Sequence, residues 1–194
     1  GIAERLGGYP CFVKPANLGS SVGVSKASNE KELICGIYEA GKFDRRVIVE
    51  EGMNIREVET AVIGNDEPIA AVVGEIIPSA EFYDYTAKYF DGGQSKLIIP
   101  ADLPKETSEK IREYAVRAYK TLDCAGFARV DFFVTKDTGE IYINEINTIP
   151  GFTKFSMFSA LFKAAGIDYP HVIERIVDYG YERYNIKNSR KTNI

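Results

Sequence analysis

The sequence predicts an α+β fold built as two lobes with a cleft between them. Two observations lead to this prediction: the order of the expected elements, and a long irregular segment in the second part of the chain. The first part reads as strand, Gly/Ser loop, strand, helix and strand, and the second reads as a sheet, a long loop, a helix, a hairpin and two helices. We therefore divide the chain into residues 1–57, residues 58–187 and a tail at 188–194.

The elements of the first lobe follow from short apolar runs and one capped helix. Cys11–Lys14 has the composition of a short strand that stops at Pro15, and a second strand is expected where the Gly/Ser loop ends. Asn29 begins a helix whose apolar residues recur at helical spacing up to Gly41. Val47–Glu50 is the third strand.

The second lobe combines strands with amphipathic helices. Lys105–Leu122 has the apolar spacing of a helix, and a turn at Lys136–Gly139 separates the two strands of a hairpin. The strands are expected at Val58–Ile63, Ile69–Ile77, Phe127–Thr135 and Glu140–Ile146, and the last two helices at Phe155–Ala165 and Tyr169–Tyr184.

The composition is that of a soluble globular protein and excludes several classes. Of the 194 residues 45% are hydrophobic and 27% are charged, and the formal net charge of -4 gives no basic field for nucleic acid. No apolar run approaches the roughly 20 residues of a membrane span, and the N-terminus lacks a signal-peptide apolar region. The three cysteines fit neither a disulfide framework nor a zinc site, so we expect a reduced, cytoplasmic protein.

Two pairs of polar residues on the hairpin attract attention. Alternate residues of a strand face the same side, so Arg129 projects with Asp131, and Glu145 projects with Asn147. A three-residue loop at Asp137–Gly139 would place the two pairs face to face, whereas a two-residue loop would place them on opposite faces. The three-residue loop is the register we favour.

In that register Lys136 faces Glu140, Asp131 faces Glu145 and Arg129 faces Asn147. Two carboxylates in cross-strand contact repel each other, and a divalent cation would reverse the sign of that interaction. Two carboxylates and an Asn carbonyl are hard oxygen ligands that suit Mg²⁺ bound with substrate phosphates. The alternative is a solvated surface hairpin in which Arg129 pairs with Asp131 or Glu145.

Two segments of the first lobe are candidate nucleotide contacts. Gly19–Gly23 follows the strand that carries Lys14, and its backbone N–H groups and Ser hydroxyls can hold phosphate oxygens. Glu50 and Glu51 end a strand, and with Glu57 close by they could offer backbone groups to a purine and a carboxylate to ribose. The alternatives are a plain Gly/Ser turn and a plain acidic turn.

The loop at 79–95 is unusual for a simple connection. Four aromatic rings occur between Phe82 and Tyr89, next to the polar run Asp91-Gly92-Gly93-Gln94. A lid that closes on a ligand accounts for both properties. A packed structural loop is the alternative.

Taken together, these segments resemble D-alanine–D-alanine ligases from about Pro10 to Tyr184. The matching motifs are Phe-Val-Lys-Pro at 12–15, Gly-Ser-Ser-Val-Gly at 19–23, Val-Glu-Glu-Gly at 49–52, Phe-Tyr-Asp-Tyr-Thr-Ala-Lys-Tyr at 82–89, Ala-Arg-Val-Asp at 128–131 and Asn-Glu-Ile-Asn-Thr-Ile-Pro-Gly-Phe-Thr at 144–153. The tyrosine-rich loop and the Asn-Glu-Ile-Asn-Thr-Ile-Pro-Gly run are the specific ones.

The resemblance implies an ATP-grasp fold with an incomplete first lobe, and it assigns roles to residues. Those implied for ATP are Lys14, Gly19, Ser20, Ser21, Gly23, Glu50, Glu51, Met53, Glu57 and Lys88. Lys14 contacts phosphates, Glu50 binds the adenine amino group and Glu57 takes the ribose. The ligands implied for two Mg²⁺ ions, or Mn²⁺ in their place, are Asp131, Glu145 and Asn147.

The resemblance also implies residues for catalysis and for the amino-acid substrates. Arg129 and the backbone of Gly151 stabilise the oxyanion of a tetrahedral intermediate, and Lys88 contacts the transferred phosphoryl group. Ser156 receives the carboxylate of the second substrate, while Ser21 helps to hold the lid over the first.

The implied reaction is ATP-dependent ligation of two D-alanines through D-alanyl phosphate, for peptidoglycan synthesis. Tyr89, which holds the lid together with Ser21, and Met157 occupy positions that vary with the second substrate, and both favour D-alanine. The alternatives are a D-alanyl-D-serine or other D-alanyl-D-X ligase, or another ATP-grasp carboxylate–amine ligase. The family's N-terminal domain has no counterpart here, so we expect the chain alone to be inactive and the full-length enzyme to be a candidate homodimer.

Overall fold

The computed structural model describes residues 1–19, 21–78, 96–154 and 156–190. The chain divides into two compact units, and each is described by itself. Unit 1 comprises Gly1–Asn54 with Pro78–Lys96, and unit 2 comprises Ile55–Ile77 with Leu97–Ile194. The expected lid at 79–95 lies outside the described residues.

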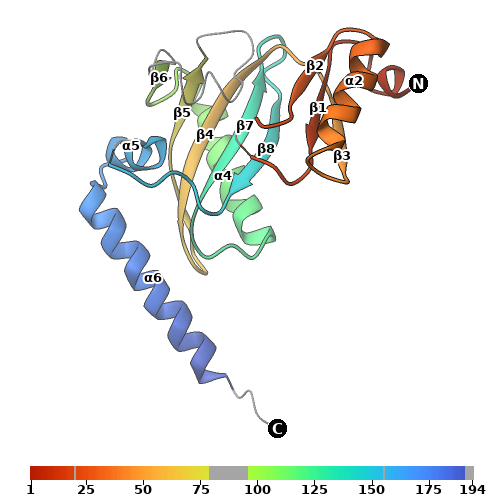
Figure 1. Ribbon diagram of the computed structural model, residues 1–194. Coiled ribbons are helices and arrows are strands. Elements are labelled where there is room, and N and C mark those ends of the chain that lie inside the picture. The colour runs from red at the N-terminus through yellow and green to blue at the C-terminus, as the bar shows by residue number, and fades with distance from the viewer. Residues whose placement is uncertain (20, 79–95, 155, 191–194) are drawn as a thin grey trace. The chain divides into compact units, whose positions relative to one another are not determined.

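Unit 1 is a small antiparallel sheet with one principal helix (Figure 1). Its elements are α1 (Ile2–Arg5), β1 (Cys11–Pro15), β2 (Ser25–Ala27), α2 (Glu30–Gly41) and β3 (Val47–Glu51), with strand order β2-β1-β3. Asn29 caps α2, because its side chain accepts a hydrogen bond from the backbone N–H of Glu32. Cys11, Val13, Leu33 and Ala40 form the buried core between β1 and α2.

Unit 2 is a five-stranded antiparallel sheet with helices on both faces. The strands are β4 (Ile55–Gly64), β5 (Ile69–Ile77), β6 (Lys96–Ile98), β7 (Gly126–Thr135) and β8 (Ile141–Asn147), in the order β6-β5-β4-β7-β8. The helices are α4 (Lys105–Thr121), α5 (Met157–Ala164) and α6 (Tyr169–Ser189).

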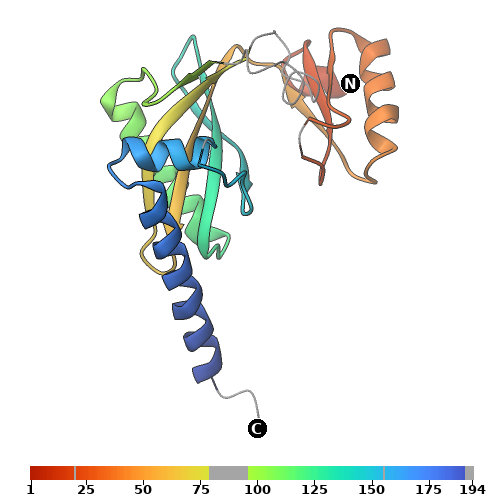
Figure 2. The ribbon, with the colours of Figure 1, turned by 60° about the vertical axis from the view of Figure 1, so that its left-hand side comes forward.

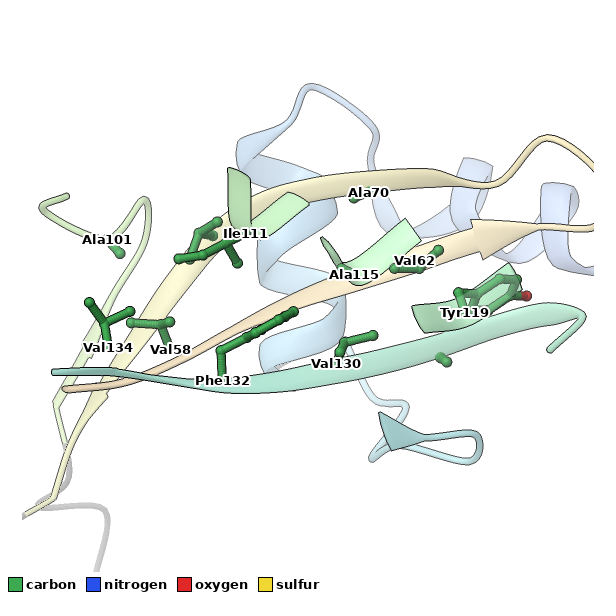
Figure 3. Packing of buried hydrophobic residues seen from close by; sticks show 12 residues of the cluster. Val58, Val62, Ala70, Ala101, Ile111, Ala115, Tyr119, Val130, Phe132 and Val134 are labelled. Atoms are coloured by element: carbon green, nitrogen blue, oxygen red, sulfur yellow. The ribbon is translucent and has the colours of Figure 1, made fainter. Parts of the chain in front are cut away.

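Each face of this sheet has its own core. On one face Ile111, Ala115 and Tyr119 of α4 pack over Val130 and Phe132 of β7 (Figure 3). The other face packs against α5 and α6 through a second cluster, which contains Ala61, Ile63, Phe127, Met157, Phe158, Leu161 and Phe162. Since strand residues alternate between faces, β7 serves both clusters and also presents Arg129 and Asp131 on the α5 side of the sheet.

The last helix has few contacts with the sheet. Of its residues only Val172 is buried, and α6 extends well past α5 and the end of the sheet (Figures 1 and 2). None of the helices in the described ranges combines the length and apolar composition of a membrane span.

The order and type of the predicted elements are confirmed. The boundaries of β5 agree with the expectation, β4 begins earlier, at Ile55, and α6 continues past Tyr184 to Ser189. The short elements α1 and β6 were not predicted, because four and three residues are too few to show a period.

Candidate active site

Three carboxylates form a row across neighbouring strands of unit 2. Glu59 of β4 lies opposite Asp131 of β7, and Asp131 lies opposite Glu145 of β8. The adjacent row brings Arg129 opposite Asn147. These side chains share one face of the sheet, so acidic groups are concentrated where a cation would be attracted.

Arg129 partly neutralises this row. Its Nε and Nη2 atoms each donate a hydrogen bond to Asp131, both at 2.7 Å, and Nε lies 3.4 Å from Oε1 of Glu59. Burial lowers the pKa of the guanidinium, but the hydrogen bonds to Asp131 and the charges of Glu59, Asp131 and Glu145 outweigh burial and raise the pKa above its ordinary value. Arg129 therefore stays charged at any pH at which the protein is folded.

Asn147 joins the two carboxylates that were predicted to bind metal. Its Nδ2 donates to Oδ2 of Asp131 at 3.1 Å and to Oε1 of Glu145 at 3.0 Å. The three predicted ligands are thus brought together by one amide group. Turning this amide by half a revolution would present its oxygen in place of its nitrogen, which gives three oxygen donors of the kind that Mg²⁺ prefers.

The donor set fits magnesium only if other ligands contribute. Within the described ranges, no group of three or more His, Cys, Asp or Glu side chains is arranged to hold a metal ion. Mg²⁺ needs six ligands and commonly keeps waters and substrate phosphates among them, so two carboxylates and one amide suit an ion that arrives with a nucleotide.

The hairpin has the expected pairing but a different loop length and a bulge. The predicted pairing of Asp131 with Glu145 is confirmed, but the predicted three-residue loop is wrong. Thr135, and not Lys136, pairs with Glu140 through the backbone, which leaves a four-residue loop at 136–139. A register shift between Asp131 and Phe132 then restores the expected partners.

The apolar residues of β8 explain this shift. Ile141 and Ile143 pair with Val134 and Phe132, whose side chains face α4, and Ile146 pairs with Val130 on the same face. Ile143 and Ile146 are three residues apart, so strict alternation would place them on opposite faces. One residue between them must therefore bulge out to keep all three isoleucines on the α4 side. The bulge leaves Glu145 on the opposite face, beside Asp131.

Glu59 was missed in the sequence. It is buried, with 3% of its surface exposed, and it completes the row of carboxylates. The signal was present in the alternation of Glu57 and Glu59, two carboxylates on one face of a strand whose remaining residues are largely apolar. Glu57, predicted to bind ribose, lies on the same strand opposite Phe133 and Ile76.

In unit 1 the predicted nucleotide contacts are partly assembled. Lys14 of β1 and Glu50 of β3 form an ion pair with Nζ 2.7 Å from Oε1. Among the described strands β3 is an edge, with β1 on one side only, so the backbone near Glu51 and Met53 has groups that no neighbouring strand uses.

The Gly/Ser loop is tightly turned. Ser21 and Gly23 have φ values of 57° and 72°, and a Cβ on Gly23 would lie 2.8 Å from Phe43 and 2.9 Å from Pro15. Glycine is therefore required at position 23 for both its conformation and its packing. Gly19 accepts a hydrogen bond from the backbone N–H of Val22, and Ser20 lies outside the described residues.

The remaining predicted residues occupy the segment after β8. Gly151 is exposed in the connection to α5, and Ser156 is the residue that precedes the first turn of this helix. Ser156 Oγ donates to the carbonyl of Thr153 at 2.8 Å. Met157 belongs to the apolar cluster and is only 9% exposed, so its described neighbours are core side chains. Lys88 and Tyr89 lie outside the described residues.

Comparison with known proteins decides the family. Residues 2–178 match the family model described as D-ala D-ala ligase C-terminus. The chain belongs to this family. Among curated D-alanine–D-alanine ligases it is 59% identical to that of Ruminiclostridium cellulolyticum over 186 residues and 60% identical to that of Acetivibrio thermocellus over 184 residues. These alignments cover 95% of the chain but 50% and 48% of the relatives, so the chain spans about half their length.

Solved ligase structures agree with the ATP-grasp fold that the resemblance implied. The D-alanine–D-alanine ligase of Coxiella burnetii superimposes with a TM-score of 0.85 at 34% identity, covering 97% of this chain and 50% of that one. The VanG D-Ala:D-Ser ligase of Enterococcus faecalis has a TM-score of 0.82 at 42% identity, with coverage of 92% and 51%. Both curated and solved relatives are thus ligases that act on D-alanine.

Proposed function

We propose that this chain is the catalytic part of an enzyme that ligates two D-alanines into D-alanyl-D-alanine with ATP, for peptidoglycan synthesis in the cytoplasm. The observation that carries this proposal is the convergence of Asp131, Glu145 and Asn147, with Arg129 beside them, in a member of the ligase family. Asp131 and Glu145 repel each other across the strands, and a bound cation would make their proximity favourable.

The proposal assigns nucleotide contacts to residues of β1, β3 and β4 and to two loops. In the proposal Lys14 binds ATP phosphates, Glu50 accepts from the adenine amino group, and Glu57 binds the ribose. The backbone at Glu51 and Met53 adds adenine contacts, which the edge position of β3 supports. The phosphate loop consists of Gly19, Ser20, Ser21 and Gly23, and the lid contributes Lys88.

Asp131, Glu145 and Asn147 would hold two Mg²⁺ ions, which when bound offset the negative charge of the phosphates during transfer. The protein's own contribution to this step is positioning, because a carboxylate and a triphosphate repel each other unless they are held in line. Arg129, which is charged and partly buried, adds a fixed positive group at the same place.

Arg129 and the backbone N–H of Gly151 are the proposed donors to the oxyanion that forms when the amine of the second D-alanine attacks the acyl phosphate. One strong donor of this type lowers the activation barrier by about 3–4 kcal/mol. Ser156 precedes α5, and the positive end of the helix suits the carboxylate of the second substrate. A closed lid, held by Ser21 and Tyr89, would exclude water from the acyl phosphate.

The second substrate is proposed to be D-alanine. The curated relatives at 59% and 60% identity are named D-alanine–D-alanine ligases, whereas the D-Ala:D-Ser ligase is 42% identical. Tyr89 supports the same choice through the resemblance described above. Met157 contributes less to the argument, because its side chain is buried among apolar residues.

The decisive experiment measures ADP release by the full-length enzyme with Mg·ATP and D-alanine, D-serine or D-lactate. We expect D-alanine alone to support turnover and D-alanyl-D-alanine to be the product. Turnover that requires D-serine as the second substrate would establish the alternative ligase, and turnover without any D-alanine requirement would reject both. We expect the 194-residue chain alone to bind Mg·ATP weakly, as calorimetry can show, and to have little or no activity.

A further inference from the structure

Burial of the Glu59 carboxylate costs free energy unless a partner compensates for the lost hydration. It is 3% exposed, and on the β5 side its cross-strand neighbour is Gly74, where an added Cβ would lie 2.8 Å from Leu161. Helix α5 therefore packs closely beside it, and little water can reach the carboxylate. An ionised carboxylate at such a site requires a nearby positive charge.

Arg129 supplies that charge. Its Nε lies 3.4 Å from Oε1 of Glu59 and donates to Asp131, so the guanidinium is placed between two carboxylates of neighbouring strands. The two carboxylates differ in their surroundings. Asp131 belongs to the proposed metal site, whereas Glu59 lies on the central strand β4, where α5 packs beside it. The pair with Asp131 uses both of its carboxylate oxygens.

In the proposed function Asp131 has two roles that compete: it accepts hydrogen bonds from Arg129 and it binds the metal ion. Asp131 would hold the metal ion through the same oxygens that accept from the guanidinium, which would weaken its hold on Arg129. Arg129 must nevertheless remain fixed, because preorganised donors lose their value when they have to be reoriented during the reaction. Glu59 is the acidic partner that a metal ion at Asp131 leaves in place.

We propose that Glu59 is a positioning residue that holds the Arg129 guanidinium in place when Asp131 binds magnesium. The inference rests on the proposed function of Asp131 and Arg129, and it concerns a carboxylate to which that function gave no role. Glu59 acts through Arg129 and has no direct contact with the substrate.

The same sheet contains a matched control. Glu75 of β5 is buried, with 6% exposed, and accepts two hydrogen bonds from Arg56 at 2.7 and 2.6 Å. It pairs with Val58, whose side chain faces α4, so this ion pair lies on the opposite face of the sheet. Glu75→Gln removes a buried carboxylate from an arginine without touching the proposed site.

The first test is a double-mutant cycle in the full-length ligase. We expect Glu59→Gln to lower kcat about tenfold and to change KM for ATP less than about twofold, as is typical of residues that orient a catalytic group. On an Arg129→Ala background the same change should lower kcat less than about twofold, whereas any loss from Glu75→Gln should be equal on both backgrounds. Equal losses from Glu59→Gln on both backgrounds would overturn the proposal.

The second test observes the guanidinium directly and requires no turnover. In the nuclear magnetic resonance spectrum, Mg²⁺ with a non-hydrolysable ATP analogue should leave the Nε–H proton of Arg129 in slow exchange with water in the unmutated protein. In Glu59→Gln, the same addition should accelerate this exchange at least about tenfold, because the guanidinium then lacks the Glu59 carboxylate and shares Asp131 with the metal ion. An exchange rate that does not respond to the mutation would refute the role of Glu59.

Two further results separate the possible failures. If Glu59→Gln does not fold, Glu59→Asp, which keeps the charge and withdraws it by one methylene, takes its place in both tests, with smaller effects of the same sign. If the unmutated enzyme shows no D-alanine-dependent ADP release, the proposed function fails, and the exchange measurement with Mg²⁺ and the ATP analogue still confirms or refutes the positioning of Arg129.

Discussion

Lys14 and Glu50 form an ion pair across β1 and β3, with Nζ 2.7 Å from Oε1. The register places Lys14 opposite Ile48 and Glu50 opposite Phe12, so the two side chains meet diagonally on one face of the sheet. Both were predicted from the sequence to contact ATP. A nucleotide bound as proposed would offer Lys14 a phosphate and Glu50 an amino group, so binding exchanges this pair for two new ones.

Glu50→Gln should raise the dissociation constant for Mg·ATP about tenfold, since one charge-assisted hydrogen bond is worth about 1.5–3 kcal/mol and Gln keeps part of it. Calorimetric titration of the full-length enzyme with a non-hydrolysable ATP analogue measures the change. Glu39→Gln, which removes an exposed partner of Lys42 on α2, is the control and should leave the constant unaltered. Equal constants for Glu50→Gln and the unmutated enzyme would remove Glu50 from the nucleotide site.

Glu145→Gln should abolish ligation by weakening the metal site, with kcat reduced at least about 100-fold and the Mg²⁺ concentration for half-maximal rate raised. Rates measured over a range of Mg²⁺ concentrations separate these effects. Glu140→Gln changes an exposed carboxylate on the same hairpin, hydrogen-bonded to Thr138 and Tyr142, and should have little effect. An unchanged Mg²⁺ dependence in Glu145→Gln would show that the carboxylate row does not hold the metal.

Met157→Arg should chiefly destabilise the fold, and any change in substrate preference should be secondary. Met157 is 9% exposed and packs in the cluster beneath α5, where a guanidinium would have no described polar partner among its apolar neighbours. We expect a loss of about 3 kcal/mol in the free energy of unfolding, and less than about 1.5 kcal/mol for Met157→Leu. Denaturant titration of both variants, followed by a comparison of D-alanine and D-lactate, tests this. A stable Met157→Arg enzyme that prefers D-lactate would support the predicted substrate role of this position.

His171 should titrate above its ordinary range. A hydrogen bond from the His171 ring to Asp168, then the charges of Asp168 and Glu174, raise the pKa of this imidazole, while Arg175 opposes them. Because the pKa is raised in the folded state, the protonated ring stabilises the start of α6, and this stabilisation is complete below about pH 6.5. It is lost as the pH rises through the folded-state pKa. His171 is the one histidine of the chain, so its proton resonances report the pKa directly. A value at or below 6.5 would contradict the expectation, and in Asp168→Asn the pKa should fall.

Much of the fold was predictable because its elements are long and periodic. The α4 helix has apolar residues at helical spacing, β7 alternates strictly between buried and partly exposed residues, and Asn29 caps α2 as expected. The pairing of Asp131 with Glu145 was also correct, although it was derived from the wrong loop. Periodicity therefore identifies the face on which a side chain lies more reliably than it identifies the length of a turn.

The parts that were missed depend on contacts distant in sequence. Glu59 and Arg129 are separated by 70 positions along the chain and become neighbours only when β4 pairs with β7. The burial of Met157 likewise depends on Gly74, whose missing side chain allows α5 to approach, since a Cβ there would lie 3.2 Å from the sulfur of Met157. A single sequence shows the glycine but not the helix that lies over it.

The four-residue loop and the bulge of the β7–β8 hairpin have a consequence for how this hairpin can change in length. A three-residue loop without the bulge also brings Asp131 opposite Glu145, but either change alone shifts the register by one residue and turns Glu145 towards α4. That holds for a hairpin of this length. Deletion of Asn144, the residue that the ladder skips, should remove the bulge and keep Glu145 opposite Asp131, and a change in the length of the loop at 136–139 should leave the strand pairing as it is. Homologous hairpins should accordingly differ in the loop and in the bulge while they keep the pairing of Asp131 with Glu145.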